Sequence, residues 1–389
     1  MLVLGDDTGS FLAIVRSLGR RGIEMHAAPR LLSAPALKSR FIAKRHDVPE
    51  WADDPAAWVR AVIDILTAEH FDLVIPCDET SLLPLAANRR VFEPLARLAI
   101  PDDGSIEVLF DKHATRQLAQ RLGIPVPPGR LPRPDDTAES LVAEFGLPLM
   151  VKPRRSFSLD GLSRRRMVTA AADQAEIASV LPTIGPETEF FEGFVPGRGL
   201  GVSILAHRGR LLQVFQHQRV REDSSGSYYR VSAPVAERYR EAVAGIVSAL
   251  NYTGVAMFEF RADEADDSWV LLEVNARPWG SLPLAVNAGV DFPWCWYRLL
   301  VAGDELPPMP YCVGLYGRNL VPDLRAVVRR LHGNTWAGIK QLTEFARVFV
   351  GRERHDVLTI DDLAPGLEEI GRLAGSVWRS LERFHADWK

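Results

Sequence analysis

The residues with the clearest chemical pattern lie in the acidic, β-rich segment 255–277. Two apolar runs flank a polar turn there, which is typical of a β-hairpin. With Asp266 at the centre of the turn, Glu259 faces Glu273. Asn275 shares the face of Glu273, because side chains alternate between the two faces of a strand. Two facing carboxylates repel, and a divalent cation between them would remove that cost. Carboxylate and amide oxygens are hard ligands of the kind that suits Mg²⁺.

Three basic residues could complete a phosphate site beside such a cation. Arg277 lies two residues beyond Asn275 on the same face, where its forked guanidinium could hold a phosphate. Lys152 ends an apolar run and Lys112 begins a helical one. Residues 151–170 contain six basic residues and one aspartate, a net charge of +5, so this segment could close over phosphates. Each feature also has a plainer interpretation: a solvated hairpin face, surface lysines, and an exposed basic turn.

The composition of the chain argues against several other functions. Its 389 residues suggest two to three domains at about 150 residues each. The 46 Lys and Arg against 50 Asp and Glu give a net charge of −4, which argues against a whole-protein grip on nucleic acid. The three cysteines predict no disulfide framework and favour a reducing compartment. None lies in a C-x-x-C pattern or near paired histidines, which argues against a structural zinc site. We find no signal peptide and no long apolar run, so we expect a cytoplasmic protein without a transmembrane segment.

The N-terminal part of the chain predicts a parallel, doubly wound α/β domain. Short apolar runs alternate with segments of helical periodicity. The expected strands are 2–4, 23–27 and 73–76, and the expected helices are 11–21, 58–68 and 79–92. Ligands of such sheets bind at the carboxyl ends of the strands, here at loops 5–9 and 77–80. Asp78 and Glu79 are interpreted as the start of a helix rather than as a catalytic pair.

The rest of the chain predicts a small α+β unit, then a β-rich unit, then a helical end. The expected elements are helices 112–122 and 138–145, strand 149–152, strands near 188–195, 201–206, 211–219, 254–261 and 269–275, helix 235–250, and helices 324–331, 339–350 and 367–384. The predicted fold class is therefore α/β and α+β, with domains at 1–110, 111–190, 191–308 and 309–389.

Five motifs in this order resemble the ATP-grasp superfamily, of the carboxylate–amine ligase type. They are Asp111-Lys112, residues 123–127, residues 149–153, residues 190–197, and Glu259 with residues 273–278. The plan is similar to those of carbamoyl phosphate synthetase, biotin carboxylase and D-alanine–D-alanine ligase. The resemblance implies an N-terminal doubly wound domain, a small lid domain and a β-rich central domain, with ATP between the last two, followed here by a helical C-terminal extension.

The same resemblance implies roles for single residues. Lys112 and Lys152 would contact the phosphates of ATP, and Lys152 and Arg277 would be catalytic, with Arg277 on the transferred phosphoryl group. The adenine would lie against the hinge segment Glu192, Gly193, Phe194 and Val195. The metal ligands would be Glu259, Glu273 and Asn275, holding Mg²⁺ or alternatively Mn²⁺.

The implied reaction joins a small-molecule carboxylate to an amine through an acyl phosphate and releases ADP and phosphate. Alternatives are a phosphorylating or carboxylase-like enzyme, and a non-catalytic nucleotide-binding regulatory protein. Arg219, Ser227, Arg230 and Ser281 are candidate substrate contacts, and His217 and Glu222 are weak candidates for a base. A homodimer is a further expectation, through the C-terminal region.

Two departures from the family pattern stand out. The first glycine after the 149–153 motif is Gly161, so the phosphate lid would use arginines and serines more than bare backbone. Gly199 and Gly201 follow the hinge where relatives often carry an acidic residue for the ribose, which leaves the ribose contact open.

Overall fold

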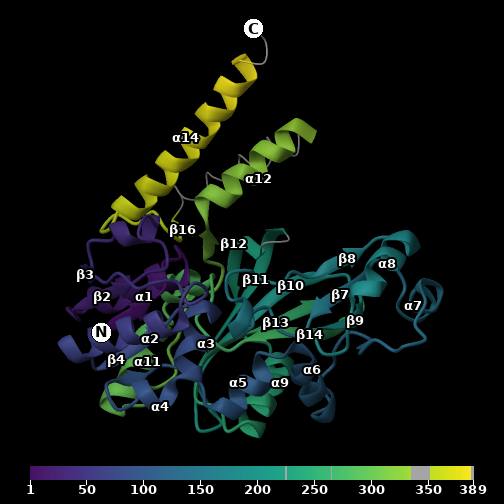
Figure 1. Cartoon of the computed structure of the whole chain (residues 1–389), viewed down its shortest axis with the longest axis horizontal. Coiled ribbons are helices and arrows are strands. Elements are labelled where there is room, and N and C mark those ends of the chain that lie inside the picture. Colours follow the sequence, from purple (N-terminus) through teal and green to yellow (C-terminus); the bar gives the residue numbers. More distant parts are fainter. Residues whose placement is uncertain (224–225, 264, 334–350, 387–389) are drawn as a thin grey trace.

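The computed structural model describes residues 1–223, 226–263, 265–333 and 351–386, which form three β-sheets with surrounding helices (Figure 1). The N-terminal sheet and its helices lie on one side of Figure 1, the small sheet lies on the other side, and the large sheet lies between them. This arrangement confirms the expected mixture of α/β and α+β parts. The domain boundaries themselves stay predictions.

The N-terminal sheet is parallel throughout, in the order β3-β2-β1-β4-β5. Its strands are β1 (Leu2–Leu4), β2 (Met25–Ala28), β3 (Ile42–Arg45), β4 (Leu73–Pro76) and β5 (Arg97–Leu98). The helices around them are α1 (Ser10–Gly19), η1 (Pro35–Lys38), α2 (Pro55–Ala68), α3 (Glu79–Ala87) and α4 (Arg89–Phe92). The strand order changes direction at β1, so the loops after β1 and β4 meet at the edge where ligands of doubly wound sheets bind.

Local capping explains where the helices of this unit begin and end. Asp78 caps α3, and its side chain accepts a hydrogen bond from the backbone N–H of Ser81. This confirms the interpretation of Asp78 as a helix start. The single helix expected over 79–92 is wrong, because the segment divides at Asn88, whose side chain donates to the carbonyl of Pro84.

The small sheet is antiparallel throughout, in the order β6-β9-β7-β8. Its strands are β6 (Gly129–Arg130), β7 (Leu149–Pro153), β8 (Thr169–Ala171) and β9 (Glu189–Gly193). Two helices, α7 (Ala138–Phe145) and α8 (Gln174–Val180), pack on it through one apolar cluster, with the short turns η2 (Leu159–Gly161) and η3 (Leu181–Thr183) nearby. Two further helices, α5 (Asp103–Leu109) and α6 (Lys112–Arg121), connect this sheet to the N-terminal unit.

The large sheet has the order β14-β13-β10-β11-β12-β15-β16. Its strands are β10 (Arg198–His207), β11 (Arg210–Asp223), β12 (Gly226–Ala233), β13 (Gly254–Ala262), β14 (Trp269–Asn275), β15 (Tyr316–Arg318) and β16 (Glu353–His355). One face is covered by α5, α6 and α9 (Glu237–Ala249). A second apolar cluster joins this sheet to α1 through α10 (Leu282–Ala288) and α11 (Phe292–Tyr297), which η4 (Arg298–Ala302) follows. The position of the large sheet relative to the N-terminal unit is thus fixed by a shared core.

Three strands of this sheet correct the sequence-based expectation. The stretch 216–230 was expected to be a strand end and a polar loop, yet β11 continues to Asp223 and β12 follows it. The C-terminal region was expected to be helical, yet it also supplies β15 and β16. Both short strands carry charged side chains that are completely buried, because Arg318 pairs with Asp323 and Glu353. A buried ion pair removes the apolar alternation by which strands are recognised in a sequence.

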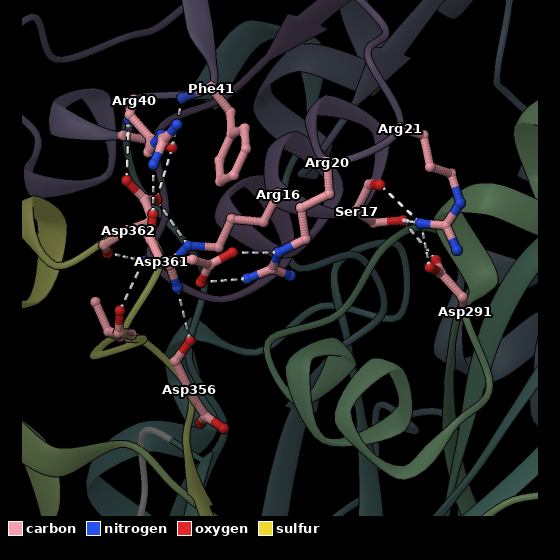
Figure 2. A network of polar contacts seen from close by, with 12 residues as sticks. Arg16, Ser17, Arg20, Arg21, Arg40, Phe41, Asp291, Asp356, Asp361 and Asp362 are labelled. Atoms are coloured by element: carbon pink, nitrogen blue, oxygen red, sulfur yellow. Dashed lines mark hydrogen bonds and ion pairs between the residues drawn. The ribbon is translucent and has the colours of Figure 1, made fainter.

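A segment of the C-terminal region, residues 356–362, returns to the N-terminal unit and is held there by ion pairs (Figure 2). The guanidinium of Arg16 lies 2.8 Å from the carboxylate of Asp362, and both side chains are buried. Arg20, which follows the last residue of α1, pairs with Asp361 at 2.6 Å. These ion pairs therefore join residues near the start of the sequence to the segment 356–362 near its other end.

The helix α12 (Leu320–Gly333) follows β15, and α14 (Ala364–Ala386) follows the anchored segment; Figure 1 shows both projecting away from the body of the molecule. They correspond to the helices expected over 324–331 and 367–384. The helix expected over 339–350 lies outside the described residues. Among the helices of the described residues, none combines the length and the apolar character that a membrane span requires.

Candidate active site

The β13–β14 hairpin places the two glutamates as the sequence predicts. Glu259 pairs with Glu273 in the register of the two strands, and Met257 pairs with Asn275. Phe258 belongs to the apolar core beneath α9, so its neighbour Glu259 lies on the opposite face. The facing carboxylates therefore lie on the sheet face opposite α5, α6 and α9.

Cations from three other elements compensate these carboxylates. Arg219 Nη2 of β11 lies 2.5 Å from Glu259 Oε2, and Lys112 Nζ at the start of α6 lies 3.5 Å from Glu273 Oε2. Asn275 Nδ2 donates to Glu259 Oε1 at 3.3 Å. Burial raises the pKa of Glu259, although Arg219 opposes the shift. Burial also disfavours ionised Glu273, but Lys112 and Lys152 outweigh it and lower its pKa.

Arg277 is held in this group by a residue from the N-terminal unit. Its Nε lies 2.7 Å from Glu79 Oε2 at the start of α3, and its Nη2 donates to Asn275 Oδ1 at 3.3 Å. The N-terminal unit thus orients a guanidinium beside the hairpin. Sequence reasoning missed this role of Glu79, because the two residues are 198 positions apart and no periodicity connects them.

Lys152 lies on β7 and forms an ion pair with Glu192 on β9. Arg116 Nη1 approaches the same carboxylate at 3.4 Å. Gly193 follows at the buried end of β9, whereas Phe194 is exposed and Val195 is partly buried. The side chain of Glu192 therefore contacts two cations. The nucleotide roles given to these residues stay predictions.

The sheet face that carries Glu259 and Glu273 borders a cavity of about 500 Å³ between the large and small sheets. Nine of the proposed site residues border it: Lys112, Arg219, Ser227, Arg230, Glu259, Glu273, Asn275, Arg277 and Ser281. Arg165 and Arg166 of the basic segment border it as well, together with His217 and Trp279. The cavity therefore collects positive charge around two carboxylates.

Two of the proposed substrate contacts are already paired with acidic side chains. Arg230, which is buried, forms an ion pair with Asp356 of the C-terminal segment, whose carboxylate is completely buried. Arg219 also pairs with Glu222 at 2.8 Å, so Glu222 is engaged rather than free to act as a base. Burial and the neighbouring Arg230 hold the pKa of His217 well below its usual range, so His217 is neutral near pH 7.

The glycines after the hinge have a packing reason. A Cβ at Gly201 would lie 2.4 Å from Cε1 of His217, and one at Gly199 would lie 2.7 Å from Cδ of Arg219. Only glycine lets these two cavity side chains lie flat against β10. The two glycines, which depart from the family pattern, therefore allow His217 and Arg219 of β11 to pack closely against β10.

Comparison with known proteins agrees with this geometry. Residues 191–311, which include the hairpin, match a family described as ATP-grasp in the biosynthetic pathway with Ter operon. This part of the chain is therefore similar to the ATP-grasp superfamily. This match confirms the resemblance and covers the proposed metal ligands, whereas Lys112 and Lys152 lie outside the matched range.

Individual ATP-grasp relatives match longer parts of the chain. A formate-dependent phosphoribosylglycinamide formyltransferase of Burkholderia thailandensis is 27% identical over 277 residues, which is 68% of this chain and 66% of that protein. A D-alanine–D-alanine ligase of Alkalilimnicola ehrlichii is 28% identical over 227 residues, or 53% of this chain and 71% of that one.

A solved structure supports the same fold. The biotin carboxylase domain of 2-oxoglutarate carboxylase from Hydrogenobacter thermophilus, a dimer in complex with MgADP, ADP and bicarbonate, superposes with a TM-score of 0.60 at 17% identity. The match covers 81% of this chain and 73% of that one.

Proposed function

We propose that this chain is an ATP- and Mg²⁺-dependent ligase that joins a carboxylate to an amine through an acyl phosphate and releases ADP and phosphate. The observation that carries the proposal is the convergence of two facing carboxylates, an amide and several cations on one cavity of about 500 Å³. The D-alanine–D-alanine ligase among the relatives and the neighbour that holds MgADP support this class of reaction.

The hairpin offers a donor set that fits Mg²⁺. Glu259, Glu273 and Asn275 contribute only oxygen ligands of the hard type, and two of them are carboxylates in direct register. In the protein as described, Arg219 and Lys112 partly balance their charge. When bound, the cation would neutralise charge on the triphosphate; Mn²⁺ stays an alternative prediction.

The chain's own cations would position the phosphates. Lys112 Nζ also donates to Ser156 Oγ at 2.7 Å, which directs it toward the segment that we expect to cover the phosphates. Arg277, oriented by Glu79, would contact the phosphoryl group in transfer. We assign Lys152 to the phosphates and the hinge residues 192–195 to the adenine, by the family resemblance.

The reaction needs no protein nucleophile. An oxygen of the substrate carboxylate attacks the γ-phosphorus, the bond to the β-phosphate oxygen breaks, and ADP leaves. The amine then attacks the acyl carbon, phosphate leaves, and the amine loses a proton. Positioning and charge neutralisation supply most of the catalysis in such a transfer. The substrates would be oriented by other residues that border the same cavity: Arg219, Ser227, Arg230 and Ser281.

The proposal also includes a location in the cell and an oligomeric state. The sequence predicts a cytoplasmic location and a homodimer. In this proposal the acid and the amine are small molecules. A screen of acid and amine pairs would identify them.

The experiment compares Glu273→Gln with the wild-type protein. Glu241→Gln, at an exposed position of α9, is the matched control. Calorimetric titration with ADP, with and without Mg²⁺, reports nucleotide binding before any substrate is known. ADP and phosphate release is then measured with pairs of carboxylic acids and amines. We expect Glu273→Gln to weaken Mg²⁺-dependent binding and to reduce turnover by about 10²–10³-fold, the usual loss for an electrostatic group of this kind. Unchanged turnover in Glu273→Gln would show that the metal assignment is wrong, and phosphorylated acid that accumulates without amine would favour the phosphorylating alternative.

A further inference from the structure

A second group of metal-ligating side chains lies in the N-terminal sheet, apart from the ligase cavity. His26 belongs to β2, His46 directly follows β3, and Glu69 follows α2. One ligand atom from each lies within 4.8 Å of the others. Both histidines are buried, and Glu69 is partly exposed. His26 is in register with Leu2 at the start of β1 and thus lies near the amino end of β2, whereas His46 lies just past the carboxyl end of β3.

The distances within the cluster are close to those of a zinc site. His26 Nδ1 lies 3.0 Å from His46 Nε2 and 3.1 Å from Glu69 Oε2. A four-coordinate zinc ion with bonds of about 2.0–2.2 Å separates its ligands by about 3.3 Å. Small side-chain movements would therefore bring all three atoms to a common ion.

The carboxylate of Glu24 orients the imidazole ring of His26 for metal binding. Glu24 Oε1 lies 2.8 Å from His26 Nε2, and in a neutral ring it would hold the proton there. The unprotonated Nδ1 then points at the centre of the cluster, the arrangement by which a carboxylate orients a metal-binding histidine. In this tautomer Nδ1 and the carboxylate of Glu69 are two acceptors only 3.1 Å apart, so a cation between them removes a repulsion.

We propose that His26, His46 and Glu69 bind one Zn²⁺ ion, with a fourth position open to water. Two imidazoles and a carboxylate suit zinc, whereas Mg²⁺ prefers oxygen ligands. The site is therefore chemically different from the hairpin and independent of the ligase reaction.

The location gives such an ion a structural purpose. β3 has only four residues and lies at the edge of the sheet, and its register with β2 shifts beside His26. An ion bound here ties β2, the end of β3 and the end of α2 together. Lys44 on β3 forms an ion pair with Glu69, so the ammonium competes with the metal for this carboxylate.

The test is a titration of the chelator-treated, full-length chain with Zn²⁺ in excess Mg²⁺, which occupies oxygen-only sites. Calorimetry gives the stoichiometry, and Co²⁺ as a probe gives the intense visible absorption of a four-coordinate ion with nitrogen ligands. We expect one Zn²⁺ per chain and a higher melting temperature with the metal. His46→Asn and Glu69→Gln should each weaken binding by at least about 100-fold and abolish the Co²⁺ bands, and Glu24→Gln should weaken it by about 10-fold.

Two further variants test whether these residues bind a metal ion or only form hydrogen bonds and ion pairs with one another. His70→Asn changes an exposed histidine next to Glu69 and should leave Zn²⁺ binding unchanged. Lys44→Met removes the competing ammonium and should tighten binding. Circular dichroism of each metal-free variant confirms that it is folded. Absence of stoichiometric binding to the folded wild type, or binding that survives in His46→Asn and Glu69→Gln, would overturn the proposal, whatever the outcome for the ligase activity.

Discussion

The anchor of the C-terminal segment on α1 allows a matched comparison of two arginines. Arg16 is buried, pairs with Asp362 at 2.8 Å and donates to three backbone carbonyls of residues 356–362. Arg20 pairs with Asp361 in a partly exposed position, with side-chain exposures of 37% and 46%. Removal of one partner from a buried pair costs about 3–5 kcal/mol, whereas an exposed pair contributes about 0–1 kcal/mol.

We therefore expect Arg16→Met to lower the free energy of unfolding by about 3 kcal/mol. The lower end of the range applies because Asp362 keeps hydrogen bonds from Ser39 Oγ at 2.7 Å and from the backbone N–H of Arg40 at 2.9 Å. Arg20→Met should lower it by less than about 1 kcal/mol. Urea unfolding followed by circular dichroism and by tryptophan fluorescence measures both changes.

A double variant tests the reason for this difference. Arg16→Met combined with Asp362→Leu removes both charges, so it should be less destabilised than the sum of the two single variants. Equal losses in Arg16→Met and Arg20→Met, or additive effects in the double variant, would refute the reasoning from burial.

Three other predictions concern the cavity. Glu79→Gln should reduce kcat/KM by about 10–100-fold, because a charged hydrogen bond that orients Arg277 contributes about 1.5–3 kcal/mol; unchanged kinetics in a folded variant would contradict the positioning role. Asp356→Asn should lower the free energy of unfolding by about 3–5 kcal/mol, since buried Arg230 loses its counterion; a loss below about 1 kcal/mol in a urea titration would speak against it. Burial lowers the pKa of His217, so below about pH 6.5 the unfolded chain binds one proton more than the folded chain. The free energy of unfolding therefore decreases as the pH is lowered through this range. His217→Gln should remove up to about 1.4 kcal/mol per pH unit of this dependence, measured by unfolding between pH 5 and 7; the same slope in both proteins would count against a buried, neutral His217.

The sequence by itself determined the local geometry of the site. The facing of Glu259 and Glu273 follows from the position of the turn and from the alternation of side chains along a strand, and the structure confirms this pairing. The N-cap at Asp78 likewise follows from residue type and position. The helix break at Asn88 was not foreseen, because the apolar periodicity continues across it.

Only the tertiary structure decided which distant charges compensate one another. Arg277 depends on Glu79 and Arg230 depends on Asp356, and the latter pair is 126 positions apart. Periodicity reports the geometry of one helix or strand, whereas these ion pairs depend on how separate elements pack. For the same reason β16 could not be predicted from the sequence. At Glu353 a buried, paired carboxylate takes the place of an apolar residue by which a strand is recognised. Local rules therefore place single side chains, and packing between distant segments decides which of them meet.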